Sequence, residues 1–570
     1  MDTPDYGRAP NACSDIPRYV AYTSPVSTGR MNINEGSPAA TLPLNLVALI
    51  ISYLDDIGDI ARVTRTSRLH YYMTLPQLYQ RVSLHSYADI RYVNGRPEGF
   101  GSGSPFTMAL NGLVTKSHAT LVQEFKVHGK WREVGLEEFA KGRVPDNSMM
   151  LNILLRAAMD KMVRLQSFSW ELDSKPLKTL YQGLAGHSTL TSLNLKFPNS
   201  RVPRPSVIIP PIPSLRVLKV TDIDPLCYPD DISMLLLHSR KLEDLRLHFS
   251  PRMRREAEPS VSLQTYFGKC WEAKYRLKLK HFALQHFFGI SDAAFPVLFD
   301  PDTCKSTTFI DTFGGTGSNP QNVYVDDTWK NLPTDMKTSF LSSRINEVAP
   351  QHVEILRRAT GQERLYLINA KPSKTEDLEA SPASTPITPG DTPPANEEMA
   401  QLGKEYLYVL TRHHGQSLKH LLLRDQWAFG AEDVGDLVRY CPNLEQLGLS
   451  LSSSNHAVMR LLMPFLPKLR AMRILYNEWL AENMRVVSHE DRMAGMSAEL
   501  WRPGAECLEW IGIADAVYKV GKNYRAVQAD GTSEWRREVT LASRADVQHI
   551  EIWGLDVLDI GADPILPFSP

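Results

Sequence analysis

A six-residue apolar pattern that returns at nearly constant intervals is the feature that most constrains this fold. An apolar residue is followed three and five residues later by two more, as in Leu190, Leu193 and Leu195. Because 43% of the 570 residues are apolar, about 45 such matches are expected by chance. Chance does not explain intervals of 25, 25 and 27 residues in one stretch and of 26 and 25 in another, between Leu165, Leu190, Leu215 and Leu242 and between Leu418, Leu444 and Leu469. The chain is therefore predicted to be a stack of similar units.

These intervals fall within the range of roughly 20 to 29 residues that leucine-rich repeats have, in which each unit adds one strand to a curved parallel sheet. Further copies predict strands at 122–127, 279–284, 508–513 and 547–552, and less regular copies predict strands near 307–309, 340–345 and 365–367. Intervals of 37 or 39 residues follow Leu242, Leu469 and Leu508, so we expect lengthened loops there.

A helix is expected ahead of each strand. Residues 433–440 place Val434, Leu437 and Val438 on one helical face, and Pro442 then ends the helix before the strand at Leu444. Residues 458–466 show the same order before Leu469. We therefore predict an α/β fold, an irregular solenoid with parallel strands on its concave side and helices outside.

Two stretches without apolar periodicity separate the predicted parts of the chain. Residues 1–38 are rich in Pro, Ser, Gly and Asn, and 371–400 combine proline with acidic residues, so both are expected to be disordered. The predicted organisation is a disordered leader at 1–38, a helical unit with a first capping strand at 39–90, repeats at 91–370, a disordered insertion at 371–400 and repeats at 401–570. Four Ser-Pro or Thr-Pro sites in the insertion are candidates for phosphorylation: Ser381, Thr385, Thr388 and Thr392.

Residues 41–84 differ in kind from the repeats. Thr41 can cap a helix whose first turn holds Pro43, and apolar residues then follow at helical spacing through Ile57. Two further short helices are expected, the last at 67–73. Three short helices bury little core of their own, so a partner is expected to complete the unit. A simpler alternative is a helical cap that shields the first repeat.

The residues of this unit resemble the F-box family, in the form that filamentous fungi join to leucine-rich repeats. The residues that carry the resemblance are Leu42-Pro43, Leu46, Ile50, Tyr53-Leu54, Ile60, Ser67-Arg68 and the run 75–84. His70 departs from the family, in which that position is commonly aromatic, so looser packing of the third helix is expected.

The resemblance implies that the chain selects substrates for a Skp-cullin-F-box ubiquitin ligase and does no covalent chemistry itself. The helical unit would bind a Skp-type adaptor, and through it a cullin, while the repeats would bind an unknown protein target. The implied adaptor-binding residues are Leu42, Pro43, Leu46, Ile50, Tyr53, Leu54, Ile60 and Val63.

Specificity for a target is expected on the concave strand face, because alternation turns the residues between the buried leucines toward it. The candidate target-binding residues are Lys196, Lys219, Arg246, Arg424, Arg473 and Trp553. Arginine pairs well with carboxylates and phosphates, so an acidic or phosphorylated target would fit. A merely solvated strand face is the alternative.

Composition excludes several other classes. With 63 Lys and Arg against 64 Asp and Glu, the formal charge is −1, so the chain as a whole does not attract nucleic acid or anionic membranes. Six scattered cysteines disfavour a zinc site and a disulfide framework, and the longest apolar run, 44–51, is too short to span a membrane. We expect a cytoplasmic or nuclear protein without cofactor or metal. Gly314-Gly315-Thr316-Gly317 lacks the lysine of a phosphate loop, so an enzyme is the least favoured class, after a repeat scaffold without a ligase.

Overall fold

The computed structural model divides the chain into two compact units, 1–78 and 79–570. The break falls inside one helix, so strand β1 belongs to the second unit. The described residues are 42–99, 103–131, 137–141, 143–198, 206–224, 230–250, 261–262, 266–287, 289–290, 298–300, 302–310, 340–346, 348–369, 397–452, 463–475, 487–527 and 531–562.

The first unit consists of three helices, α1 (Leu44–Ser52), α2 (Ile57–Thr64) and α3 (Arg68–Gln80). Asp56 caps α2 by accepting a hydrogen bond from the Asp59 amide at 2.8 Å. The Thr64 and Thr74 hydroxyls, 2.8 Å apart, join α2 to α3, and Gln77 donates to the Leu54 carbonyl at the end of α1. The three expected helices are present, although α3 continues past the expected end at 73 and includes Pro76.

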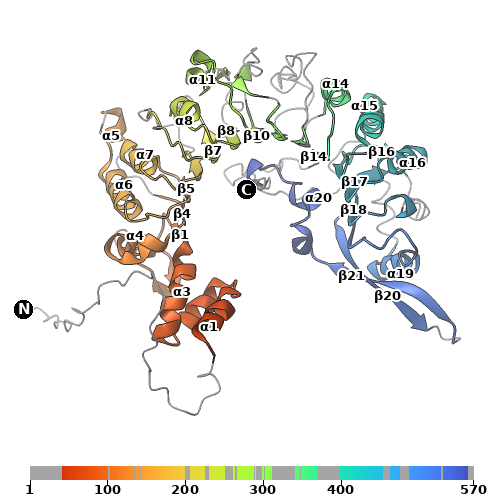
Figure 1. The fold of residues 1–570 in the computed structure, drawn as a ribbon, viewed down its shortest axis with the longest axis horizontal. Coiled ribbons are helices and arrows are strands. Elements are labelled where there is room, and N and C mark those ends of the chain that lie inside the picture. The colour runs from red at the N-terminus through yellow and green to blue at the C-terminus, as the bar shows by residue number, and fades with distance from the viewer. Residues whose placement is uncertain are drawn as a thin grey trace, which may run out of the picture. The chain divides into compact units, whose positions relative to one another are not determined.

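The second unit is built on a 17-stranded sheet, most of which is parallel. Fourteen of its strands pair with one another in chain order (Figure 1). They are β1 (Arg81–Ser86), β4 (Glu124–Gly129), β5 (Ser167–Leu172), β6 (Ser192–Lys196), β7 (Val217–Ile223), β8 (Asp244–Phe249), β10 (His281–Gln285), β12 (Ser306–Ile310), β13 (Ser342–Ile345), β14 (Arg364–Leu367), β15 (His420–Leu422), β17 (Gln446–Leu451), β18 (Ala471–Ile474) and β19 (Trp510–Ile513).

The register of the parallel strands aligns the repeated apolar positions. Phe168 pairs with Leu193, Leu193 with Leu218, Leu218 with Leu245, and Leu245 with Phe282. All five side chains are buried, so equivalent residues of successive units stack into one continuous ladder. This ladder is the physical reason that a spacing of about 25 residues specifies the fold.

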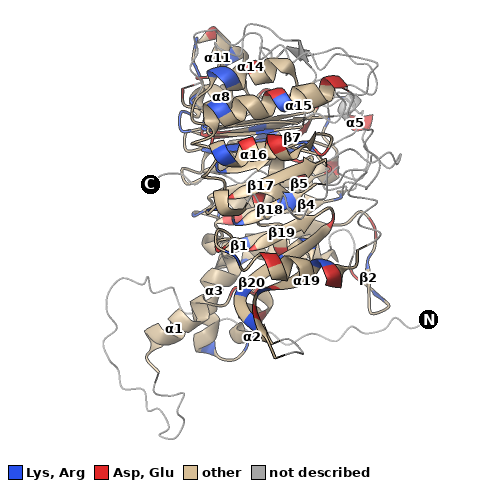
Figure 2. Ribbon diagram, turned by 90° about the vertical axis from the view of Figure 1, so that its right-hand side faces the viewer, with Lys and Arg blue, Asp and Glu red and all other residues tan. Residues whose placement is uncertain are grey.

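Helices cover the outer side of this sheet, and strands line its inner side (Figure 1). The main apolar core lies between the two layers. Helices α15 and α16 carry acidic and basic residues, as expected for an outer layer in water (Figure 2). The helices are α4 (Pro105–Thr115), α5 (Glu137–Ala140), α6 (Asp146–Met159), α7 (Lys178–Ala185), α8 (Ser233–His238), α11 (Gly268–Glu272), α14 (Pro350–Arg358), α15 (Glu397–Val409), α16 (Ala431–Tyr440) and α19 (His489–Glu499).

Shorter elements complete the second unit. Helical turns occur at η3 (Ser117–Leu121), η4 (Leu410–His414) and η5 (Met463–Phe465). The small strands are β2 (Tyr92–Val93), β3 (Arg96–Pro97), β9 (Val261–Ser262), β11 (Gly289–Ile290) and β16 (Ala428–Phe429). None of the helices in the described ranges has the length and apolar character needed to cross a bilayer.

The structure confirms a strand at each predicted copy of the pattern except the last. Residues 547–552, predicted as a strand, instead end the turn η6 (Arg544–Val547) and begin helix α20 (Glu551–Gly554). The reason lies in the preceding interval, where β20 (Ala516–Val527) and β21 (Ser533–Ala542) form an antiparallel hairpin on the edge of β19. That edge is therefore no longer open to a further parallel strand.

Other expectations meet the structure only in part. The helix expected at 433–440 is α16, whereas most of 458–466 lies outside the described residues and its described end is the turn η5. The insertion was expected to extend to residue 400, but α15 already begins at Glu397, so its last four residues are helical. The leader, the rest of the insertion with its four phosphorylation candidates, and 314–317 lie outside the described residues.

Candidate interaction surfaces

The first candidate surface is the apolar face of α1. This helix of nine residues contains no charged side chain, and only Ile51 is buried. Six large apolar residues on α1 or directly beside it are exposed. Their exposed fractions are 46% for Leu42, 57% for Leu44, 41% for Leu46, 50% for Leu49, 57% for Ile50 and 75% for Tyr53. Apolar side chains gathered in this way are typical of a surface that binds another protein.

The residues that the family resemblance assigns to adaptor binding divide into two groups. Leu42, Pro43, Leu46, Ile50 and Tyr53 are exposed on and beside α1. Leu54 and Val63 are half-buried, and Ile60 is only 3% exposed. Ile60 therefore packs inside the three-helix unit, where its role is to hold α2 in place.

The second candidate surface is the concave face of the sheet, which the end of the chain covers. After β21, residues 543–562, here named the C-terminal segment, turn back along the inner side of the strands (Figure 1). The segment consists of η6, α20, an irregular stretch and the turn η7 (Ile560–Ala562). Its contacts reach from β20 and β19 back to β7.

Arginines on the strands bind the main chain of this segment. Arg344 donates to the carbonyls of Leu555 at 3.1 Å, of Val557, and of Asp559 at 2.9 Å. Arg246 donates to the Ile560 carbonyl at 2.9 Å. These donors satisfy carbonyls of an irregular stretch that has no regular ladder of its own.

Two glutamines bind the segment with both ends of their amide groups. Gln285 donates to the Leu558 carbonyl at 2.6 Å and accepts from the Ile560 amide at 3.0 Å. Gln446 donates to the Glu551 carboxylate and accepts from the Ile552 amide at 3.2 Å. Each glutamine thereby fixes the register of the segment against its own strand.

Asp556 forms a buried ion pair at the centre of the interface. Its carboxylate lies 3.0 Å from Arg473 Nη2 and accepts a hydrogen bond from the backbone N–H of Asn369 at 3.2 Å. Arg473 also donates to the Ile552 carbonyl at 2.7 Å. Both charged groups are nearly inaccessible, so removing either one would leave the other buried without its main partner.

Apolar residues of the segment complete two clusters that are separate from the main core. Trp553 and Leu555 pack with Tyr366, Leu422 and Leu475, among others. Leu558 and Ile560 pack with Ala283, Ile310 and Ile368. The strands thus bury one set of apolar residues on the helix side and a second, smaller set beneath the segment.

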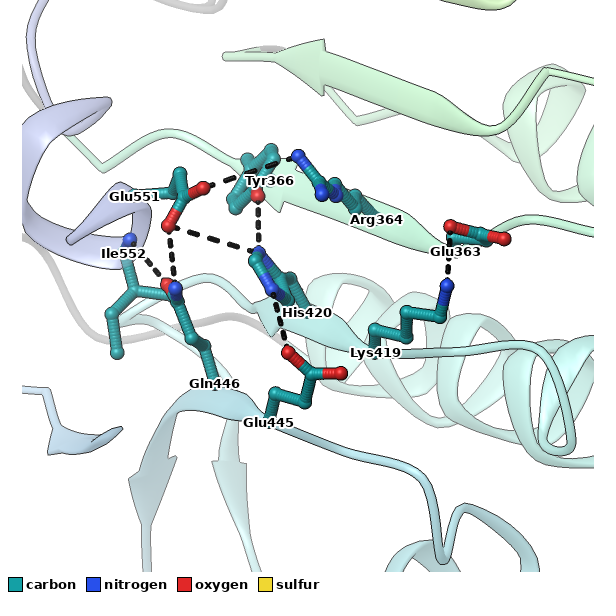
Figure 3. A network of polar contacts seen from close by, with 9 residues as sticks. All are labelled: Glu363, Arg364, Tyr366, Lys419, His420, Glu445, Gln446, Glu551 and Ile552. Atoms are coloured by element: carbon teal, nitrogen blue, oxygen red, sulfur yellow. Dashed lines mark hydrogen bonds and ion pairs between the residues drawn. The ribbon is translucent and has the colours of Figure 1, made fainter. Parts of the chain in front are cut away.

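A polar network surrounds His420 at the edge of this interface (Figure 3). Its Nδ1 lies 2.8 Å from the Tyr366 hydroxyl and 4.0 Å from Glu551, and its Nε2 lies 3.9 Å from Glu445. Burial lowers the pKa of His420 to about 4, and the nearby cations Arg364 and Lys419 lower it too. Glu551 and Glu445 raise the pKa, but offset only part of this lowering. His420 is therefore neutral at pH 7.

The residues expected to bind a target lie on or beside this face but are not equally accessible. Arg246 and Arg473 are buried beneath the C-terminal segment, and Trp553 is part of the segment and 4% exposed. Arg424 donates to the Asn346 and Ile368 carbonyls. Two lysines are half-buried: Lys196 lies 3.8 Å from Asp222, and Lys219 lies against Gly561.

Sequence reasoning missed several residues that hold the segment, namely Arg344, Asn369, His420 and Gln446. Arg344 lies in one of the less regular copies of the pattern, at 340–345. Its signal was available, since it occupies the same strand position as Arg246 and Arg473 and, like them, directly precedes an apolar residue.

Among the residues that the structure describes, no group of three or more His, Cys, Asp or Glu side chains has the geometry of a metal site. No protein-family model matches the sequence, and no curated protein matches it significantly.

Proposed function

We propose that this chain is the substrate-recognition subunit of a Skp-cullin-F-box ubiquitin ligase. In this role the three-helix unit binds a Skp-type adaptor, and through it a cullin, while the sheet of the second unit binds a protein target. The chain itself is proposed to be non-catalytic and to act in the cytoplasm or nucleus.

The observation that supports this proposal is the exposed apolar face of α1. Leu46, Leu49 and Ile50 lie within two turns, and each is at least 41% exposed. A monomeric protein rarely exposes such a face, whereas an interface of about 800 Å² per partner would bury it. The F-box motif residues Leu42, Pro43, Leu46, Ile50 and Tyr53 lie on or beside this same helix.

A binding assay with a purified Skp-type adaptor tests the proposal. Leu46→Asp with Ile50→Asp changes two exposed side chains, so the helices should stay folded while the apolar face is lost. With about 2 kcal/mol for each buried anchor, the dissociation constant should rise by roughly a thousandfold. Val163→Asp, at a residue that is 62% exposed in the second unit, is the matched control and should bind as the wild type does.

The competing proposal, a repeat scaffold without a ligase, makes the opposite prediction for the same assay. If the wild-type chain does not bind the adaptor at micromolar concentrations, the ligase proposal is wrong. If Leu46→Asp with Ile50→Asp binds as well as the wild type, the adaptor binds elsewhere and the role given to α1 is wrong.

A further inference from the structure

The C-terminal segment and the face beneath it are complementary in charge. From 551 to 562 the segment contains three acidic residues, Glu551, Asp556 and Asp559, and no lysine or arginine. Two strand arginines meet carboxylates of the segment, Arg473 at Asp556 and Arg364 at Glu551. Arg246 and Arg344 donate to its carbonyls, and Arg246 is also paired with Asp244 of its own strand. The face therefore offers two arginines to the carboxylates of an acidic occupant.

The way in which the segment is held leaves much of its sequence free to vary. Six of its carbonyls, from Ile552 to Ile560, accept hydrogen bonds from Arg473, Arg344, Gln285 and Arg246. Every peptide offers carbonyl groups, so these contacts do not by themselves require this particular sequence. Selectivity comes from the ion pair at Asp556 and from the apolar side chains on either side of it.

Two apolar pockets define that selectivity. The first holds Trp553, whose ring lies so close to Gly512 that an added Cβ there would come within 2.7 Å of it. The second holds Leu558 and Ile560. Along the chain, Asp556 lies between Trp553 of the first pocket and Leu558 of the second.

The main core does not include the segment. The residues between the strands and the outer helices form one cluster, and none of the residues 551–562 belongs to it. The segment instead completes its own two clusters on the other side of the sheet. It can therefore leave the concave face without opening the core of the solenoid.

We propose that the concave face is a binding groove for an acidic peptide of about a dozen residues that carries an aromatic anchor before a central carboxylate and aliphatic anchors after it. Residues 551–562 occupy this groove in cis, and an external peptide of the same chemistry displaces them. That the external peptide belongs to a ligase target rests on the proposed function. That the groove binds an acidic peptide does not depend on it, and would hold equally for a scaffold without a ligase.

A labelled peptide tests the groove in the full-length chain without any adaptor. The probe is a fluorescein-labelled synthetic peptide with the sequence of residues 549–562, and its binding is followed by fluorescence anisotropy. Trp553→Ala with Asp556→Asn in the protein weakens the cis segment, so this variant should bind the probe at least tenfold more tightly than the wild type. Trp535→Ala with Asp436→Asn, at two exposed residues outside the interface, is the matched control and should bind as the wild type does.

Two further variants separate the groove from the segment. Adding Arg344→Ala to the weakened variant should lower its affinity for the probe at least tenfold. A second probe with Glu551→Lys, Asp556→Lys and Asp559→Lys should not bind detectably. Equal binding of the two probes would show that the groove does not select acidic peptides and would overturn the proposal.

Hydrogen exchange of the unaltered chain makes the test independent of any folding defect in the variants. An isotope-labelled form of the acidic peptide is added at about 5 mM, in the range of the effective concentration of a tethered segment. The protein's own fragments from 549–562 should then exchange at least tenfold faster, while those from β5 and β6 should not change. Unchanged exchange in 549–562 overturns the proposal, whereas loss of adaptor binding affects only the ligase function.

Discussion

The neutral state of His420 should make the stability of the second unit depend on pH in a defined window. The pKa of this side chain is 6.5 in an unfolded chain and about 4 in the structure, because burial disfavours the imidazolium. Between these two values the unfolded chain binds more protons than the folded one. The contribution is thus fully present above pH 6.5 and is lost as the pH falls toward 4.

The size of the effect follows from the two pKa values. A lowering from 6.5 to about 4 corresponds to roughly 3 kcal/mol once both states are protonated, and about 2 kcal/mol of this is lost between pH 7.5 and pH 5. Other buried histidines contribute in the same direction, since burial lowers the pKa of His352 to about 3. The contribution of His420 therefore has to be measured as a difference between variants.

Urea unfolding of the wild type and of His420→Gln, at pH 7.5 and pH 5, provides this difference. Glutamine retains a hydrogen-bonding amide but does not titrate. From pH 7.5 to pH 5, the free energy of unfolding of His420→Gln should therefore fall by about 2 kcal/mol less than that of the wild type. His413→Gln, at an exposed histidine of the same region, should retain the wild-type dependence. Coincident transitions by fluorescence and circular dichroism are needed to justify a single free energy. Equal losses in the wild type and His420→Gln would refute the reasoning.

Three further predictions concern the second unit. Leu193→Ala removes a fully buried side chain from the apolar ladder and should lower the free energy of unfolding by about 2 to 5 kcal/mol, measured in urea, whereas Ile208→Ala at an exposed site should change it by less than about 1 kcal/mol. Deleting 371–396, the part of the predicted disordered insertion that precedes α15, should leave the melting temperature within about one or two degrees of the wild type, and a larger loss would show that the segment is structural. Burial raises the pKa of the Cys304 and Cys441 thiols to about 12, so in the native chain iodoacetamide should modify exposed Cys507 well before either of them, as measured by mass spectrometry.

The strand positions could be predicted because they depend on a local property. A leucine such as Leu218 is buried by the equivalent residues of the neighbouring units, Leu193 and Leu245, so each unit carries nearly the same signal. The same argument correctly placed Arg246 and Arg473 on the inner side of the sheet.

The cover over that inner side could not be predicted from the pattern. Val547, Ile550 and Ile552 have the spacing of a strand, and the same residues can also line a turn followed by a short helix. The outcome depends on β20, which takes the free edge of β19 by antiparallel pairing, and on arginines hundreds of residues away. The burial of Trp553 against Gly512 also depends on the folded arrangement of distant segments, so the apolar pattern does not predict it.

The distance along the chain between the groove and its occupant has a consequence for protein synthesis. The strands of the solenoid pair with near neighbours and can form as the chain is made, whereas Arg246 meets its partner Ile560 across 314 residues. At about 5 to 20 residues per second, a ribosome needs roughly 15 to 60 s to make that stretch. During this time the first arginines of the groove are folded but uncovered, so a newly made molecule can meet an acidic peptide before its own segment exists.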